Sequence, residues 1–168
     1  MNKLSGIALF TLLVCSGFSQ WVTQKDAAFG YSVSMPTPMT KQDQSETEAN
    51  LVIKNRLLLH QGPALTLVFA ACKPSRAMTA AEKNNFTTAL KAAFLRSSGA
   101  TKTGEAKGTM NKYKGEYMDF TRRDGRKGRI WLIISAANIY ALTAVWQNDA
   151  MYKSGALKFF NSFKPSGR

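Results

Sequence analysis

Two apolar runs near the C-terminal end constrain the fold of this 168-residue chain more than any other feature. They read IWLII at 130–134 and IYALTAV at 139–145, with a short turn segment between them. A strand with one face in water alternates apolar and polar side chains, whereas these runs are apolar at nearly every position. We therefore predict two central strands that are covered on both faces.

One cover is predicted to be a long helix that begins after Thr79. Thr79 and Glu82 match a capping box, in which each side chain satisfies a free backbone N–H of the other residue. The apolar residues that follow recur at i, i+4 and i+8 and so share one face of the helix: Phe86, Leu90 and Phe94. Gly99 is the residue type that commonly ends a helix, which gives a length of about five turns.

A second helix is predicted from Asn148 or Asp149 through about Phe163. Its apolar face is expected to consist of Ala150, Leu157, Phe160 and Phe163. One helix on each face of a mostly antiparallel sheet would keep water away from the central strands. The predicted fold class is therefore α+β, with an α/β/α sandwich architecture. A β-sandwich with accessory helices is the alternative, but it offers the long helix no place.

The other β-rich segments are predicted to be strands, and the polar segments between them to be turns. The strands are expected at 29–38, 51–60, 64–72, 101–109, 113–123 and 126–135. The polar segment 40–49 has no apolar period and is interpreted as a loop. Asp124 and Gly125 predict a two-residue hairpin turn, because both residues tolerate positive φ.

Residues 1–19 have the pattern of a secretory signal peptide. Lys3 precedes an apolar stretch at 4–14, and Gly17 and Ser19 are small residues suited to cleavage before Gln20. The protein is therefore predicted to be exported, to the periplasm or the medium, with 20–168 as a single domain. Lipoprotein anchoring at Cys15 is the lesser alternative, because Val14 replaces the small residue that usually precedes a lipidated cysteine.

Side chains suited to catalysis or metal binding are scarce, so we predict no enzymatic activity, no cofactor and no metal site. His60 is the only histidine and ends a predicted strand, where we expect it in a turn or on the surface. Cys72 lies in an apolar run and is expected to be buried. Glu116 and Asp119 are expected on opposite faces of one strand, so they would not form a catalytic pair.

The chain is strongly basic, with 23 Lys and Arg against 10 Asp and Glu and a net charge of +13. The charge is densest in FTRRDGRKGRI at 120–130. The candidate anion-binding residues are Arg122, Arg123, Arg126, Lys127 and Arg129. A two-residue turn would place Arg123 opposite Arg126 and Arg122 opposite Lys127, at a cost of about 0.2–1 kcal/mol per pair. The alternative interpretation is a hairpin tip whose side chains extend into water.

Five short motifs resemble the PsbP-like and DcrB-like exported domains. In chain order they are FGYSVSMPTP, YKGEY, GRIWLI, NIYALTAV and KFFNSFK. This resemblance covers most of the chain after residue 20. It implies an α/β/α sandwich around an antiparallel sheet, and a role in binding rather than catalysis. The lipid-attachment motif of many bacterial members is absent.

The expected function is that of an exported, non-enzymatic binding or accessory domain of the cell envelope. The partner is expected to be an acidic protein surface or another envelope component. The alternative is a polyanion binder that uses the basic hairpin, with anionic lipid as a candidate ligand. Nucleic acid is disfavoured, because Trp131, Tyr140 and Trp146 lie in apolar strands rather than among the basic residues.

Overall fold

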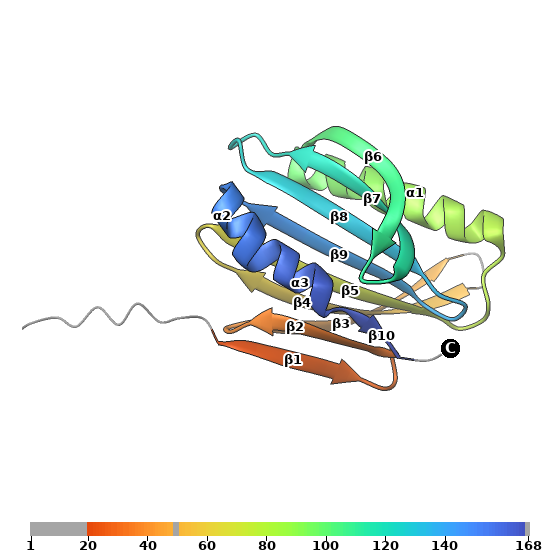
Figure 1. Ribbon diagram of the computed structural model, residues 1–168. Coiled ribbons are helices and arrows are strands. Elements are labelled where there is room, and N and C mark those ends of the chain that lie inside the picture. The colour runs from red at the N-terminus through yellow and green to blue at the C-terminus, as the bar shows by residue number, and fades with distance from the viewer. Residues whose placement is uncertain (1–19, 49–50, 167–168) are drawn as a thin grey trace, which may run out of the picture.

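The computed structural model describes residues 20–48 and 51–166, which form a large antiparallel sheet between two covering layers (Figure 1). The large sheet has seven strands in the order β3-β4-β5-β9-β8-β7-β6. In chain order they are β3 (Thr40–Glu48), β4 (Leu51–Gln61), β5 (Leu65–Pro74), β6 (Thr101–Met110), β7 (Tyr113–Thr121), β8 (Lys127–Ile134) and β9 (Ile139–Trp146). The predicted signal peptide, 1–19, lies outside the described residues.

The two helices lie on opposite faces of this sheet (Figure 1). Helix α1 (Ala80–Ser98) covers one face, where Leu90 and Phe94 pack against β7, β8 and β9. The other face is covered by the C-terminal helix and by a small sheet in the order β1-β2-β10. The small sheet contains β1 (Trp21–Asp26), β2 (Tyr31–Pro36) and β10 (Lys164–Pro165). The α+β fold class is confirmed, although the predicted first strand belongs to the small sheet.

The apolar runs of the central strands are buried as their sequences predict, except at Ile134, the last residue of β8, which is 39% exposed. All eight residues of β9 are buried, and it pairs with β5 on one side and β8 on the other. Trp131, Tyr140 and Trp146, which the sequence placed in the core, are between 1% and 8% exposed. Burial on both faces is therefore what the unbroken apolar runs encode.

Helix α1 begins and ends where its capping residues predict. The Thr79 side chain accepts a hydrogen bond from the Glu82 N–H, and the Glu82 carboxylate accepts one from the Thr79 N–H. At the other end Gly99 has the left-handed conformation, with φ of 61°. The three predicted apolar residues, Phe86, Leu90 and Phe94, all pack against the large sheet.

The prediction of a loop at 40–49 is wrong, because residues 40–48 form strand β3. This strand pairs with β4 without interruption from Thr40↔Leu59 to Glu48↔Leu51. Its side chains from 40 to 47 are all exposed. An edge strand that buries no side chain needs no apolar period, since its backbone hydrogen bonds hold it in the sheet. The polar composition of β3 therefore led to the prediction of a loop.

The C-terminal helix was predicted correctly in extent but not in its buried face. Asn148 caps α2 (Asp149–Met151), which continues through a π-helical turn (Tyr152–Ala156) into α3 (Leu157–Ser162). A π turn holds one more residue than an α turn, so it rotates the residues that follow around the helix axis. Phe160 and Phe163 are buried as predicted, whereas Ala150 and Leu157 are exposed.

Among the described helices none is long and apolar enough to cross a membrane.

Candidate functional site

The basic hairpin between β7 and β8 turns through three residues rather than the predicted two. The last paired residues are Thr121 and Lys127. Beyond them, the Arg122 N–H donates to the Arg126 carbonyl at 2.9 Å, and the Gly125 N–H donates to the Arg122 carbonyl at 3.0 Å. Gly125 has φ of 80°, the left-handed conformation that ends a three-residue hairpin loop. Arg122 therefore lies opposite Arg126, and the predicted pairs Arg122–Lys127 and Arg123–Arg126 are wrong.

One carboxylate in the turn neutralises part of this charge. The Arg126 side chain donates to Asp124 at 2.7 and 2.8 Å, and Arg122 Nε lies 3.9 Å from the same carboxylate. The hydrogen bond from Arg126 is the main reason that the pKa of Asp124 lies below its usual value. Arg123 and Lys127 are exposed and form no ion pair with a described residue. The tip therefore presents two free cations and two that share one anion.

Arg129 belongs to the sheet rather than to the tip. Its guanidinium donates to both oxygens of Asp119, at 2.6 and 2.8 Å, and stacks 4.2 Å above the ring centroid of Tyr117. The hydrogen bond with Asp119 raises the pKa of Arg129, so the group stays charged. Because its fork is already occupied by a carboxylate, Arg129 is less suited to holding a second anion than the sequence suggested.

A groove of about 500 Å³ opens beside the hairpin, between β6–β8 and the start of the C-terminal helix. Lys127 lines it, and the Asp119–Arg129 pair lies in its wall. The opposite wall contains Tyr152, whose ring lies 4.8 Å from that of Trp146. Tyr152 is the first residue of the π turn, a type of distortion that is frequent at functional sites. This groove could not be predicted from the sequence, because no local pattern marks a π turn.

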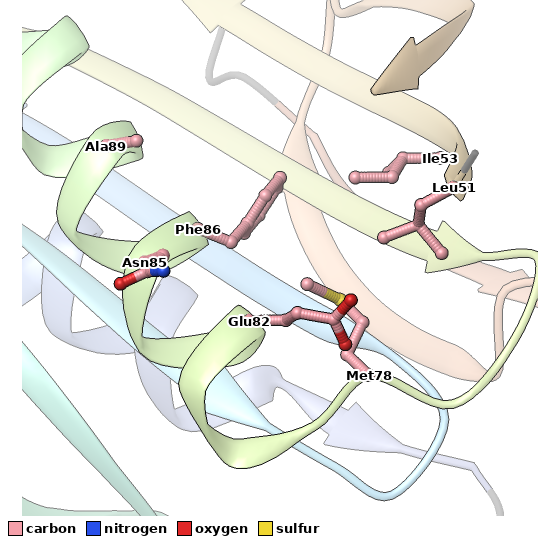
Figure 2. A pocket seen from close by; sticks show the side chains of 7 residues that line it. All are labelled: Leu51, Ile53, Met78, Glu82, Asn85, Phe86 and Ala89. Atoms are coloured by element: carbon pink, nitrogen blue, oxygen red, sulfur yellow. The ribbon is translucent and has the colours of Figure 1, made fainter. Parts of the chain in front are cut away.

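A second, apolar hollow of about 330 Å³ lies between α1 and β4 (Figure 2). Its lining is mainly aliphatic and aromatic: Leu51, Ile53, Met78, Phe86 and Ala89. Glu82 lies at its rim, where Arg76 Nη2 approaches to 2.8 Å. The hydrogen bond from Arg76 is the largest cause that lowers the pKa of Glu82 to about 2. The one acid of this hollow is thus an ionised capping group rather than a proton donor.

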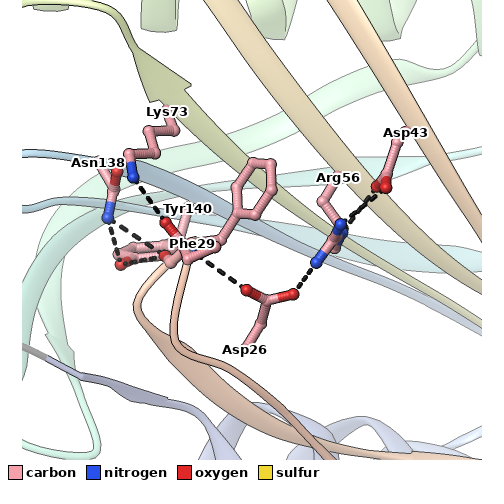
Figure 3. A network of polar contacts seen from close by, with 8 residues as sticks. Asp26, Phe29, Asp43, Arg56, Lys73, Asn138 and Tyr140 are labelled. Atoms are coloured by element: carbon pink, nitrogen blue, oxygen red, sulfur yellow. Dashed lines mark hydrogen bonds and ion pairs between the residues drawn. The ribbon is translucent and has the colours of Figure 1, made fainter.

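A polar network ties β1 and the β1–β2 turn to the large sheet (Figure 3). Arg56 forms ion pairs with Asp26 on β1 and Asp43 on β3, and its guanidinium lies 4.6 Å from the ring centroid of Phe29. Tyr140 reaches the backbone of the same turn with its hydroxyl, 2.7 Å from the Gly30 carbonyl. These contacts join segments far apart in the chain, so we assign the network a structural role.

The titratable side chains that could serve catalysis are separated or buried. His60 is 7% exposed and its Nδ1 lies 2.8 Å from the Pro38 carbonyl, so the prediction of a turn or surface position is wrong. It is buried because it lies two residues after the buried Leu58 in β4, and alternate residues of a strand share a face. Cys72 is buried as predicted, and burial raises its pKa to about 12. In the described ranges no three His, Cys, Asp or Glu side chains group as metal ligands would.

The comparison with solved structures identifies the fold. The chain is similar to the solution structure of cyanobacterial PsbP (CyanoP) from Synechocystis, with a TM-score of 0.58 and 11% sequence identity over 90% of this chain and 95% of that one. It also matches a crystal structure from Bacteroides thetaiotaomicron, with a TM-score of 0.47 and 12% identity over 83% of this chain and 46% of that one. No protein-family model matches the sequence, and no curated protein matches it. The fold is PsbP-like, as the sequence motifs implied.

Proposed function

With a PsbP-like fold as the premise, we propose that this chain is an exported, non-enzymatic binding or accessory domain of the cell envelope. Its partner in this proposal is an acidic protein surface, which contacts the basic hairpin. The support for binding rather than catalysis is the resemblance to PsbP-like domains.

The observation that carries the proposal is that most carboxylates of the protein are already paired with its own cations. Seven of its ten acidic residues form internal ion pairs with Lys or Arg. The cationic excess is therefore left for contacts outside the chain. At the hairpin, Arg123 and Lys127 are free for such contacts and the groove beside them can admit a partner's side chain.

The second candidate function is binding of an extended polyanion at the same hairpin. Its support is the density of charge, since four cations and one acid lie within 122–127. Trp146 is a poor platform for stacking on bases, because it is only 8% exposed and packs against Tyr152. A sulfated or phosphorylated polymer would fit this surface better than nucleic acid.

The test compares two sets of substitutions. Arg122, Arg123, Arg126 and Lys127 are changed to Gln in one variant, and four exposed lysines elsewhere are changed to Gln in a control variant of equal charge: Lys25, Lys41, Lys107 and Lys153. Binding of each protein to poly-glutamate and to heparin is measured over a series of salt concentrations. We expect the hairpin variant to bind poly-glutamate more weakly than the control variant, with a shallower dependence of affinity on salt.

The outcome also separates the two candidate functions. A steep salt dependence and a strong preference for heparin would favour the polyanion binder, because a packed protein interface depends less on ion release. If the hairpin variant binds both probes as tightly as the unmodified protein at low salt, the hairpin has no part in the function.

A further inference from the structure

We infer that the end of the molecule opposite the basic hairpin docks on a surface of anionic phospholipids. This end, called here the lysine end, carries six lysines from separate parts of the chain: Lys54, Lys73, Lys83, Lys112, Lys114 and Lys164. The inference concerns a different surface from the proposed function, and it stands even if the hairpin proves inert.

Several turns meet at the lysine end, which is the end of the strands opposite the basic hairpin (Figure 1). The β8–β9 turn contacts the β1–β2 turn, where Asn138 Nδ2 donates to the Phe29 carbonyl at 3.2 Å. The C-terminal segment joins them through the Ser166 N–H, which donates to the Gly30 carbonyl at 2.7 Å. One side-chain and one backbone hydrogen bond thus hold these turns together at the same end of the sheet.

Two of the lysines attach to these turns directly. Lys73 Nζ donates to the Ala28 carbonyl at 2.8 Å, and Lys83 Nζ donates to the Ser135 carbonyl at 3.3 Å. Lys73 also lies directly opposite Lys54 in the β4–β5 pairing. Like charges placed opposite each other destabilise a sheet, so this pair is better explained by an external anion than by stability.

Two hollows at this end are lined by lysines and apolar groups, with no carboxylate in either lining. One, of about 370 Å³, has Lys54 and Lys73 around Phe29, Val52 and Pro74. The other, of about 510 Å³, is bordered by a second set: Lys112, Tyr113, Lys114, Ile133, Ile134, Ser135 and Pro165. A lipid headgroup offers the matching chemistry, because its phosphate can approach the ammonium groups while the glycerol region contacts the apolar side chains.

The acids near the lysine end do little to offset this charge. Asp26 is paired with Arg56, and Glu82 with Arg76. Within the described residues none of the six lysines forms an ion pair. Glu46 on the neighbouring β3 is exposed, and Glu48 on the same strand pairs with Leu51 at this end. These two carboxylates would oppose docking if β3 reached the headgroups, but the six lysines outnumber them.

The chemistry of the side chains distinguishes this end from the hairpin. The hairpin is rich in arginine, whose fork suits a carboxylate bound through two hydrogen bonds. Among the described residues, the unpaired cations of the lysine end are lysines, and a lysine carries a compact and well-hydrated charge suited to a diffuse layer of headgroups. Ile134 is 39% exposed, one of two large apolar side chains classed as exposed among the described residues, and it lines one hollow together with Lys114. An exposed apolar residue within a basic surface is the arrangement that binds membrane interfaces.

The test is co-sedimentation of the purified protein with lipid vesicles. One set of vesicles contains phosphatidylglycerol mixed with phosphatidylcholine, and the other contains phosphatidylcholine alone. The lysine-end variant changes Lys54, Lys112, Lys114 and Lys164 to Gln, because no described residue accepts a hydrogen bond from their ammonium groups. Circular dichroism and the thermal midpoint of each variant establish that it is folded.

We expect binding only to the anionic vesicles, and a loss of at least about 100-fold in the partition coefficient of the lysine-end variant. The hairpin variant described above is the matched control and should lose much less. Ile134→Ser should reduce binding further without changing its salt dependence.

Three results would overturn the inference: no binding of the unmodified protein to anionic vesicles, an equal loss in both variants, or a larger loss in the hairpin variant. A lysine-end variant that loses affinity for poly-glutamate while keeping vesicle binding would assign this end to an acidic protein instead.

Discussion

The hydroxyl of Tyr140 offers a sharp test of how the turns of the lysine end are held. Tyr140 lies on the central strand β9 and is 1% exposed. Its hydroxyl lies 2.7 Å from the Gly30 carbonyl and 3.1 Å from the Phe29 carbonyl, and it accepts a hydrogen bond from Asn138 Nδ2 at 3.1 Å. Changing Tyr140 to Phe removes these bonds while keeping the ring in the core.

The expected loss of stability in Tyr140→Phe depends on which hydrogen bonds remain for the groups that contact the hydroxyl. The Gly30 carbonyl keeps the Ser166 N–H at 2.7 Å, and the Phe29 carbonyl keeps Asn138 Nδ2 at 3.2 Å. The three groups that contact the hydroxyl each keep another partner, so the substitution adds no penalty for an orphaned polar atom. One donated and one accepted bond are lost, each worth about 0.5–1.5 kcal/mol net, so we expect unfolding to become easier by about 1–2 kcal/mol.

Urea denaturation at equilibrium measures this change through the midpoint and slope of the transition. Tyr31→Phe is the matched control, because Tyr31 is 2% exposed in the same core and its hydroxyl donates to no described residue. That variant should change stability by less than about 0.5 kcal/mol. If Tyr140→Phe lowers the free energy of unfolding by more than about 3 kcal/mol, or leaves it unchanged, the assignment of two lost hydrogen bonds is refuted.

Two further predictions concern the core. Phe94→Ala should lower the free energy of unfolding by about 2–3 kcal/mol. This is less than for a fully buried ring, because the Phe94 ring centroid lies 4.7 Å from that of Phe120 but the side chain is only half-buried. An unchanged denaturation midpoint would show that α1 does not dock through Phe94. Cys72→Ala should flatten the loss of stability above pH 9, because the unfolded thiol ionises near 9.0 while burial raises its folded pKa to about 12. The unfolded state thus releases its proton first, and each pH unit above 9 costs at most about 1.4 kcal/mol in the unmodified protein. Stability profiles that coincide for the two proteins between pH 9 and 11 would contradict this.

The parts of the fold that the sequence predicted are those with a local cause. The Thr79–Glu82 capping box and Gly99 fix the ends of α1 through contacts within a few residues. The burial of β8 and β9 on both faces is written in their composition. Strand β3 was missed because an exposed edge strand needs a partner strand, and that partner is not visible in its own residues.

The candidate site was predictable only where its residues are neighbours in the chain. The density of charge at 122–129 was plain, but the same Asp-Gly pair fits a turn of two or three residues, and the difference changes which arginines face each other. The pairing of Arg129 with Asp119 depends on the register between two strands. The lysine end was invisible to sequence reasoning, because its lysines are spread from 54 to 164 and meet only in the folded sheet.

Strand β9 occupies the middle of the sheet but is made late in synthesis. Strands β5 and β8 both pair with β9 and not with each other. Cys72 of β5, for example, pairs with Ile139, which is synthesised much later. Until then the growing chain can form only two half-sheets, β3–β5 and β6–β8, each with an unpaired edge. Pairings across such sequence distances form slowly, because loop closure costs entropy before the contact repays it. The seven-stranded sheet can therefore be completed only after residues 139–146 have been synthesised.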